Sequence, residues 1–225
     1  VDEQGKVLWK REYVFGAWDA EITPQGTLLV TEFSISKVIE IDRDGKVLWD
    51  FEDLKNPYRA QRLADGNTLI ADTFGSRVIE VSPDGKIIWS YGRDGLVGGI
   101  RPSDADRIAN GNTLICDFRT ERVIEVSPAG EIVWKVYNMQ NAHDADRLPN
   151  GNTLITLRSK GKVVEVDKDG KQVWELANLD APGDADRLPN GNTLVAENKQ
   201  VREFDKDGKC VWSYKTAWAV EANRY

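Results

Sequence analysis

A short word, Gly-Asn-Thr-Leu, recurs along the chain at nearly constant intervals and limits the possible folds more than any other feature of the sequence. Successive copies, the first shortened to Gly-Thr-Leu, are 40, 45, 40 and 40 residues apart, and their glycines are Gly26, Gly66, Gly111, Gly151 and Gly191. A second word, Asp-Gly-Lys-x-x-Trp with variants, has its glycines at Gly5, Gly45, Gly85, Gly130, Gly170 and Gly208. Periods near 40 residues, with several short strands in each unit, are typical of propeller blades.

Each unit carries four strand signals. The first is "DADRL", the second is "TLIAD" after an Asn-Gly or Asp-Gly turn, the third is "RVIEV", and the fourth is "KIIW" after an Asp-Gly turn. Such turns favour hairpins because glycine adopts the positive φ that tight turns require. No segment keeps an apolar period of 3.6 residues over three helical turns. The sequence therefore predicts an all-β protein built from four-stranded antiparallel sheets.

The number of units predicts how the sheets are assembled. Five units carry all four signals, at 18–49, 58–89, 103–134, 143–174 and 183–212. Two signals are left over, a fourth strand at 5–9 and a first strand at 220–225, and we expect both to belong to one incomplete closing blade. The prediction is a single-domain, six-bladed β-propeller over 1–225, and the alternative is a five-bladed ring with two accessory strands. The incomplete blade would be filled by a continuation of the natural chain beyond Tyr225, or by strand exchange with another chain.

Composition and charge exclude two classes of partner. The chain has 225 residues, of which 40% are hydrophobic and 30% are charged, a globular composition. The formal net charge of -7 argues against nucleic acid as a partner, because nucleic-acid binding requires a basic face. No apolar run approaches the roughly 20 residues that span a bilayer, so no membrane span is predicted. The cysteines, Cys116 and Cys210, fall at different positions of the repeat and are predicted to be free thiols.

Two stretches of the repeat resemble known propeller families. The words "DADRLPNGNTLI" and "RVIEVSPDGKIIW" resemble repeats of bacterial and archaeal propellers of the arylsulfotransferase type. The word "EVDKDGKQVW" is similar to the tryptophan-docking repeat of PQQ-like quinoprotein propellers. The resemblance covers nearly the whole chain and implies a β-propeller and an extracytoplasmic location. It also implies a sulfotransferase in which His143 is the nucleophile or base and Arg119 or Arg158 stabilises the transferred anion.

Two features of these families are missing from the chain. Enzymes of the arylsulfotransferase type place several histidines around the mouth of the propeller, and this chain has a single histidine. No tract resembles the metal, vicinal-disulfide and stacking apparatus that quinoprotein dehydrogenases use around PQQ. The sequence therefore predicts no cofactor and no metal-ligating residues.

Residues that recur in the units are predicted to be structural. Alanine holds the same place in every first strand, where the innermost strands converge: Ala20, Ala60, Ala105, Ala145, Ala185 and Ala222. In three units Asp and Arg flank it, at Asp104, Asp106, Arg107, Asp144, Asp146, Arg147, Asp184, Asp186 and Arg187. We expect these Asp and Arg side chains to neutralise one another between neighbouring blades. A carboxylate ring that binds a cation is the alternative. The tryptophans that end the fourth strands are expected to cover the gap to the next blade.

Residues that differ between units are the candidates for function. They gather on the face where the chain enters the first strands, and loops on a rigid frame often carry binding residues. The residue that opens the first strand differs in every unit: Trp18, Tyr58, Ser103, His143, Gly183 and Val220. We predict a pocket there, at the mouth of the axis. Its candidate ligand-binding residues are Trp18, Tyr58, Arg59, Arg119, Arg158 and Trp218, and His143 is the candidate catalytic residue.

The residues of this predicted pocket suggest what it binds. Aromatic rings stack on other rings and guanidinium groups hold anions, so the expected ligand is a small aromatic or anionic molecule, or a protein partner on the same face. The predicted function is a non-catalytic ligand-binding or protein-interaction propeller. The alternative is an arylsulfotransferase-like enzyme, which requires His143 and an arginine to converge on one concave spot.

Overall fold

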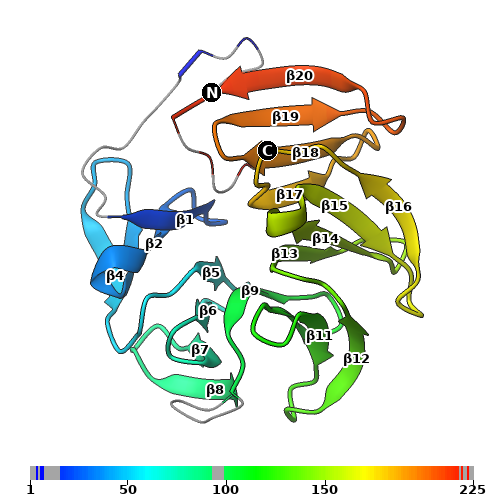
Figure 1. The fold of residues 1–225 in the computed structure, drawn as a ribbon. Helices are drawn as coiled ribbons and strands as arrows, with labels where there is room; N and C mark the ends of the chain where they lie inside the picture. The colour runs from blue at the N-terminus through cyan, green and yellow to red at the C-terminus, as the bar shows by residue number, and fades with distance from the viewer. Residues whose placement is uncertain are drawn as a thin grey trace.

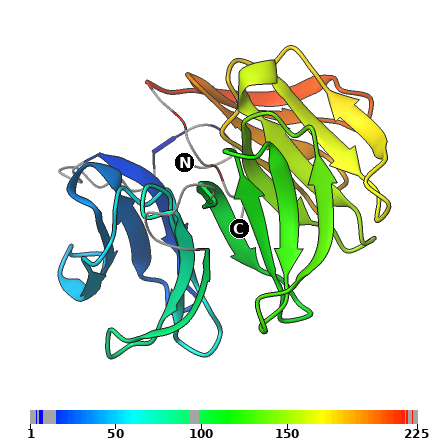
Figure 2. The ribbon, with the colours of Figure 1, turned by 60° about the horizontal axis from the view of Figure 1, so that its bottom comes forward.

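The computed structural model describes residues 4, 6–7, 16–92, 99–217, 219 and 222. Within these residues the chain forms five four-stranded antiparallel sheets, each made of four consecutive strands. The sheets stand around one axis as the blades of a propeller (Figure 1). Figure 2 shows them from the side, with the green strands of the third sheet at full length. The predicted β-propeller of four-stranded antiparallel blades is therefore confirmed.

The strands of each blade run in order from the axis to the outside. Blade 1 holds β1 (Ala17–Ile22), β2 (Leu28–Glu32), β3 (Lys37–Ile41) and β4 (Val47–Phe51). Blade 2 holds β5 (Arg59–Arg62), β6 (Thr68–Asp72), β7 (Arg77–Val81) and β8 (Ile87–Gly92). Blade 3 holds β9 (Pro102–Arg107), β10 (Thr113–Asp117), β11 (Arg122–Val126) and β12 (Ile132–Tyr137). Blade 4 holds β13 (Ala142–Arg147), β14 (Thr153–Leu157), β15 (Lys162–Val166) and β16 (Gln172–Leu176). Blade 5 holds β17 (Asp184–Arg187), β18 (Thr193–Glu197), β19 (Gln200–Phe204) and β20 (Cys210–Lys215). Short 3-10 helices, η1 (Phe33–Ile35) and η2 (Arg158–Lys160), follow β2 and β14.

Among the described residues, no helix has the length and apolar character needed to cross a membrane.

The repeated glycine words form the turns that the sequence predicts. In blade 2 the turn between β5 and β6 is closed by a hydrogen bond of 3.0 Å from the Gly66 N–H to the Leu63 carbonyl. Gly66 has a φ of 91°, a conformation that L side chains rarely adopt. The Asn67 side chain donates to Glu80 on β7 at 2.8 Å, so the turn is also tied to the third strand. These contacts are local, which is why a short word is enough to encode them.

The hydrophobic core lies between neighbouring blades and is built mainly from second and third strands. One cluster joins Leu69 and Val78 of blade 2 to Ile115 and Ile124 of blade 3, all fully buried. The first-strand alanines are at most 1% exposed in four blades: Ala60, Ala105, Ala145 and Ala185. Their predicted packing role is confirmed there, because a larger side chain would meet the next blade. Ala20 of blade 1 is exposed, so that role does not extend to it.

The number of blades differs from the number of repeated words. The described residues form five blades, so the prediction of a six-bladed ring is wrong and the five-bladed alternative fits. The segments 5–9 and 220–225, predicted as the two strands of an incomplete sixth blade, lie outside the described residues except for Lys6, Val7 and Ala222, none of which is in a strand. A sequence motif can recur without forming a blade, because a blade also requires its strands to pair with one another through hydrogen bonds. Strand exchange with another chain stays a prediction.

Arginines at the ends of the first strands join neighbouring blades, but their partners are not the predicted aspartates. Each guanidinium pairs with a third-strand glutamate of the preceding blade, in Arg62–Glu40 at 2.6 Å, Arg107–Glu80 at 2.8 Å, Arg147–Glu125 at 2.7 Å and Arg187–Glu165 at 2.9 Å. Each also lies over a fourth-strand tryptophan of that blade: Trp49, Trp89, Trp134 or Trp174. The predicted mutual neutralisation of Asp and Arg is therefore wrong. Side chains alternate along a strand, so Asp104 and Arg107, three residues apart, point to opposite sides.

The tryptophans also reach the following blade, as predicted. The indole N–H of Trp89 donates to the Pro128 carbonyl of blade 3 at 2.9 Å, and that of Trp134 donates to the Lys168 carbonyl of blade 4 at 2.8 Å. These side chains are therefore structural, and they form part of the contact between blades.

Both cysteines are free thiols, which confirms the prediction. Cys116 is buried on β10 and Cys210 is exposed at the start of β20. Burial raises the pKa of the Cys116 thiol well above its ordinary value, so this side chain behaves as a small apolar group of the core.

Candidate functional site

A small pocket opens at the end of the axis where the first strands begin. Each of the five blades contributes two consecutive residues to its wall: Trp18 and Asp19, Tyr58 and Arg59, Ser103 and Asp104, His143 and Asp144, Gly183 and Asp184. The pocket has a volume of about 30 Å³, which is room for one or two water molecules or for an ion. The most variable residue of the repeat and its neighbour therefore line one concave site.

Backbone irregularities place three of these side chains. The pairing of the first strand with the second shifts register at Trp18, Ser103 and His143, because one extra residue stands between the paired positions. Such a bulge leaves a residue out of the ladder and turns its side chain away from the ordinary alternation. In blades 2 and 5, Tyr58 and Gly183 stand just before the strand and donate their N–H groups to Ala71 and Ala196. The bulges explain why Trp18, Ser103 and His143 reach the pocket.

Aromatic rings close one side of the pocket. The rings of Trp18 and Tyr58 are stacked with centroids 4.5 Å apart, and the His143 ring lies 6.2 Å from each of them. Around Tyr58 lie three phenylalanines: Phe33, Phe74 and Phe118. Arg101 lies over the ring of Phe74 at 4.8 Å. The mouth of the pocket is therefore a packed aromatic wall.

His143 is held in one tautomer. Its Nδ1 lies 2.8 Å from the Gly183 carbonyl oxygen, which can only accept, so Nδ1 carries the proton and Nε2 is an acceptor when the ring is neutral. Burial lowers the pKa of His143 to about 4, and the positive charge of Arg158 adds to this. The ring is therefore uncharged near neutral pH.

The first aspartate of a first strand bridges to the next blade. In three blades its Oδ2 accepts the N–H of the first-strand alanine of the next blade: Asp19 from Ala60 at 3.0 Å, Asp104 from Ala145 at 3.3 Å and Asp144 from Ala185 at 3.3 Å. Asp184 Oδ2 accepts instead from the N–H of Ala222, which is not in a strand, at 2.9 Å. In blade 2 Arg59 stands where the other blades have this aspartate. These bonds give the aspartates a structural role, and each bond occupies one oxygen of the carboxylate.

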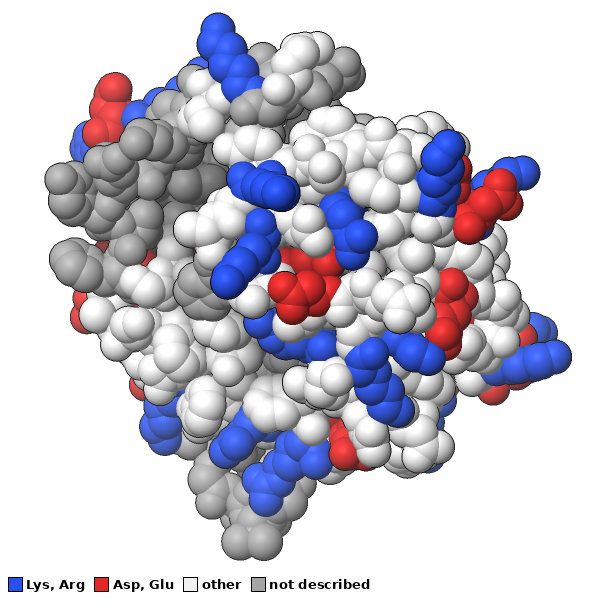
Figure 3. Space-filling model, turned by 45° about the horizontal axis from the view of Figure 1, so that its top comes forward, with Lys and Arg blue, Asp and Glu red and all other residues white. Residues whose placement is uncertain are grey.

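The axis below the mouth is strongly acidic. Carboxylates of the first strands act on one another there: Asp19, Glu21, Asp104, Asp106, Asp144, Asp146, Asp184 and Asp186. Burial, reinforced by neighbouring carboxylates, raises the pKa of Asp184 to about 8 and that of Glu21 to about 7. The same causes raise the pKa of Asp104 and Asp144 well above the usual range. On the face drawn in Figure 3, Asp and Glu gather near the middle and Lys and Arg lie around them.

Arg59 is the cation that faces this group. Its Nη1 is 3.2 Å from Asp19 Oδ1, its Nε is 3.5 Å from Asp104 Oδ1, and its Nη2 is 3.6 Å from Asp106 Oδ1. One guanidinium cannot neutralise so many carboxylates, so the pocket has a negative potential unless protons or another cation are bound.

The structure brings together four of the predicted site residues, Trp18, Tyr58, Arg59 and His143. Arg158 lies close enough to act electrostatically on His143 and Tyr58, and it donates to the Ala181 carbonyl at 2.9 Å. Arg119 is exposed and does not line the pocket. Trp218 lies outside the described residues.

The sequence indicates a cation-binding ring of aspartates only as an alternative and does not place them in the pocket wall. Their recurrence beside arginines favours ion pairs between blades instead. A signal was present in blade 2, where Arg59 replaces an aspartate that all four other blades keep. One arginine at a position that is otherwise aspartate indicates that these five side chains lie near one another at the axis, and that the aspartates are not paired with the arginines that follow them in sequence.

Comparison with known proteins identifies the family. The model of a PQQ-like repeat family, described as outer membrane protein assembly factor BamB, matches residues 1–134 and 119–222. The chain belongs to this family. Membership confirms the resemblance to PQQ-like propellers, whereas the resemblance to arylsulfotransferase-type propellers finds no support in the matches. Comparison with the curated proteins finds no match.

Several solved structures share the fold of this BamB-family chain. A protein of unknown function from Bacteroides caccae is 20% identical with a TM-score of 0.76, covering 94% of this chain and 86% of that chain. A streptogramin B lyase is 14% identical with a TM-score of 0.70, covering 89% and 69%. A catalytically inactive virginiamycin B lyase from Staphylococcus aureus with quinupristin is 12% identical with a TM-score of 0.70, covering 91% and 71%. At these identities the likeness shows the fold alone.

Proposed function

We propose that the chain is a non-catalytic binding propeller whose axial pocket holds the positively charged group of a small ligand. The observation that carries this proposal is the charge of the pocket wall, which has four aspartates and one arginine, Arg59. When its aspartates are ionised, a wall of this kind attracts cations and repels anions, and a bound cation in turn favours the ionised form. The family description, an assembly factor, also favours binding over catalysis.

The size of the pocket favours a small charged group over a ring. A volume of about 30 Å³ is much smaller than the several hundred Å³ that drug-sized ligands usually occupy. Trp18 and Tyr58 already stack on each other, so an inserted ring would have to separate them. Their outer faces can instead contact a cation, which the face of an aromatic ring attracts. The predicted aromatic or anionic ligand is therefore less well supported than an amine. A lysine of a protein partner offers the same ammonium group.

Methylammonium chloride is the probe that tests this proposal. With metal removed by EDTA at pH 8.5, we expect saturable binding of methylammonium to the wild-type protein in calorimetric titration, and no binding of sodium acetate. Asp184→Asn removes one wall charge and should weaken binding about tenfold, because a factor of ten corresponds to about 1.4 kcal/mol. Arg119→Ala, at an exposed residue outside the pocket, is the control and should bind as the wild type does. Binding of acetate alone, or unchanged affinity in Asp184→Asn, would contradict the proposal.

An arylsulfotransferase-like reaction is the second candidate. The neutral His143 ring lines the pocket and keeps an unprotonated Nε2, which is the form that a base or nucleophile requires. Two of the similar structures are lyases, so this fold can carry catalysis. The acidic wall argues against an anionic sulfuryl donor, since transfer requires positive groups around the developing charge.

We expect no such activity in the protein. Wild-type chain incubated with 4-nitrophenyl sulfate and phenol should release 4-nitrophenol no faster than His143→Ala does. The physical reason is the repulsion between the sulfate and the wall aspartates. Release by the wild type that is lost in His143→Ala would establish the enzymatic alternative and overturn the non-catalytic one.

A further inference from the structure

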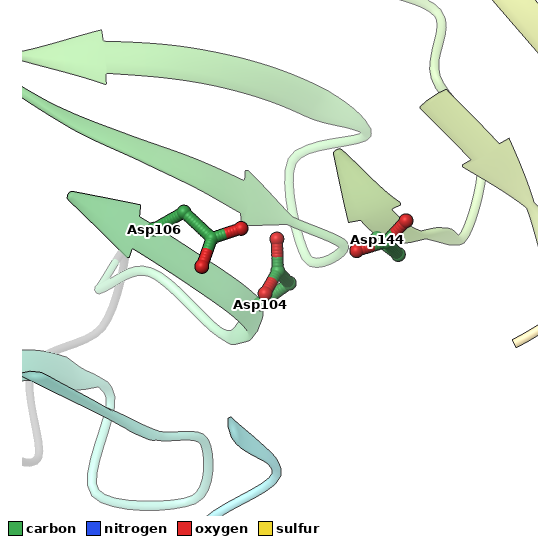
Figure 4. Close-up of side chains that lie close together, drawn as sticks. All are labelled: Asp104, Asp106 and Asp144. Carbon is green, nitrogen blue, oxygen red and sulfur yellow. The ribbon is translucent and has the colours of Figure 1, made fainter. Parts of the chain in front are cut away.

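Three carboxylates from two neighbouring blades meet at the axis. Asp104 and Asp106 belong to β9 and Asp144 belongs to β13, and Figure 4 shows their carboxylates turned toward one another. One oxygen from each lies within 4.8 Å of those from the other two. The residues are 2%, 7% and 8% exposed, so the cluster is buried.

Two of these carboxylates have an oxygen that accepts no hydrogen bond from the part of the chain that the structure describes. Oδ1 of Asp104 and Oδ1 of Asp106 are buried, and no described residue donates to either of them. The Arg59 nitrogens approach at 3.5 and 3.6 Å, beyond the roughly 3.2 Å limit of ordinary N–H···O bonds, and Arg59 is nearer to Asp19. A buried anionic oxygen without a donor is unfavourable, so both atoms indicate that a further positive charge belongs there, beyond that of Arg59, which Asp19 shares.

Arg59 is the arginine that pairs with these two oxygens, and the arginines that follow the aspartates in sequence do not. Arg107 and Arg147 follow the three aspartates in sequence but pair with Glu80 and Glu125 on the other side of the strands. Within the described residues, Arg59 is the guanidinium that acts on the axial carboxylates. The alternative to a bound cation is protonation of the carboxylates. Added metal would stabilise the protein if the carboxylates bind a cation, and would have no effect if they are only protonated.

We infer that Asp104, Asp106 and Asp144 bind a calcium ion. The inference rests on the proposed function, because both place a positive charge at the acidic axis. It differs in assigning a metal ion to a site that includes Asp106, which does not line the pocket. Carboxylate oxygens are the ligands that calcium prefers, and three oxygens that all lie within 4.8 Å of one another can each reach one ion at about 2.4 Å after small side-chain movements.

The geometry fits calcium better than magnesium. Magnesium requires oxygens at about 2.1 Å in a regular octahedron, which restricts the placement of the three carboxylates more than calcium does. Calcium also accepts water and an irregular arrangement, and the adjoining pocket of about 30 Å³ has room for water ligands. An ion held by β9 and β13 would join blade 3 to blade 4 and neutralise the carboxylates at the base of the pocket.

Calcium binding is tested on the full chain after removal of metal with EDTA and dialysis. Calorimetric titration with calcium chloride at pH 8 should show one site, and the melting temperature should rise with calcium. Magnesium chloride should bind at least about tenfold more weakly. Asp106→Asn should weaken calcium binding by about a hundredfold, because it removes one charged ligand of three.

Asp186→Asn is the matched control. Asp186 is an axial carboxylate on β17 that lies outside the cluster of three, and its replacement changes the net charge by the same amount. We expect its calcium affinity to stay within about threefold of the wild type. Equal losses of calcium affinity in the two variants would show that calcium responds only to the overall negative charge of the axis, and would overturn the site. So would a wild-type protein that shows neither binding heat nor a rise in melting temperature with calcium. Circular dichroism checks that both variants are folded.

The two proposals fail separately. Methylammonium binding without calcium binding would leave the proposed function in place and remove the calcium site. Calcium binding without methylammonium binding would do the reverse.

Discussion

Replacing Arg147 by alanine is expected to lower the free energy of unfolding by about 3 kcal/mol. The guanidinium donates to Glu125 Oε2 at 2.7 Å and to the Gly151 carbonyl at 3.0 Å, and it lies 4.6 Å from the centre of the Trp134 ring. Glu125 is 8% exposed, so alanine leaves a buried carboxylate without its cation. Two asparagine amides that also donate to Glu125 keep the loss from being larger. Urea denaturation measures the change, which corresponds to a fall in melting temperature of roughly 6–12 °C.

Two variants separate the causes of this loss. Arg147→Lys keeps the charge but not the flat face that lies over Trp134, and we expect it to cost about 1 kcal/mol. Arg119→Ala removes an exposed arginine and should stay within about 0.5 kcal/mol of the wild type. If Arg147→Ala were as stable as the wild type, the arginines would not be what holds the blades together.

Ionisation of two axial carboxylates, Asp184 and Glu21, is expected to lower the stability of the metal-free protein by about 2–3 kcal/mol between pH 6.5 and pH 8.5. Burial raises the pKa of Asp184 from 3.8 to about 8 and that of Glu21 from 4.5 to about 7. The folded protein therefore keeps protons that the unfolded chain has already released. This stabilisation is complete below about pH 4 and is lost as the pH rises through 7 and 8. Urea unfolding in the presence of EDTA, at several pH values, measures it.

His143 does not obscure this window. Its pKa falls from 6.5 to about 4 on folding, so its contribution to stability is present above 6.5 and is lost only at lower pH. Asp184→Asn cannot ionise, so it should flatten the profile and be more stable than the wild type at pH 8.5. If the stability of the wild type rose from pH 6.5 to pH 8.5, folding would not raise the pKa values of the axial carboxylates, and the prediction would be wrong.

Strand positions and turns were predictable because their causes are local. The "GNTL" and "DGKxxW" words place a glycine at each tight turn, and the β-branched "RVIEV" runs lie between them, so hairpins follow from a few adjacent residues. The period of about 40 residues then predicted blades. The small first-strand alanines, such as Ala145, were also correctly assigned to packing, because only convergence of strands explains one small residue at one level.

The number of blades, the partners of the arginines and the composition of the pocket could not be predicted from the repeated motifs, because they depend on contacts between distant parts of the chain. The number of blades depends on which strands pair, and the described residues pair as five blades where the count of words indicated six. Arg147 follows Asp146 in the chain but points to the other side of the strand and finds Glu125 in another blade. The bulge at His143 turns its ring into the pocket, and the residue types around His143 do not predict a bulge. The acidic axis exists only because five first strands converge, which brings together carboxylates that are separated by about 40 residues in sequence and leaves Arg59 to face them.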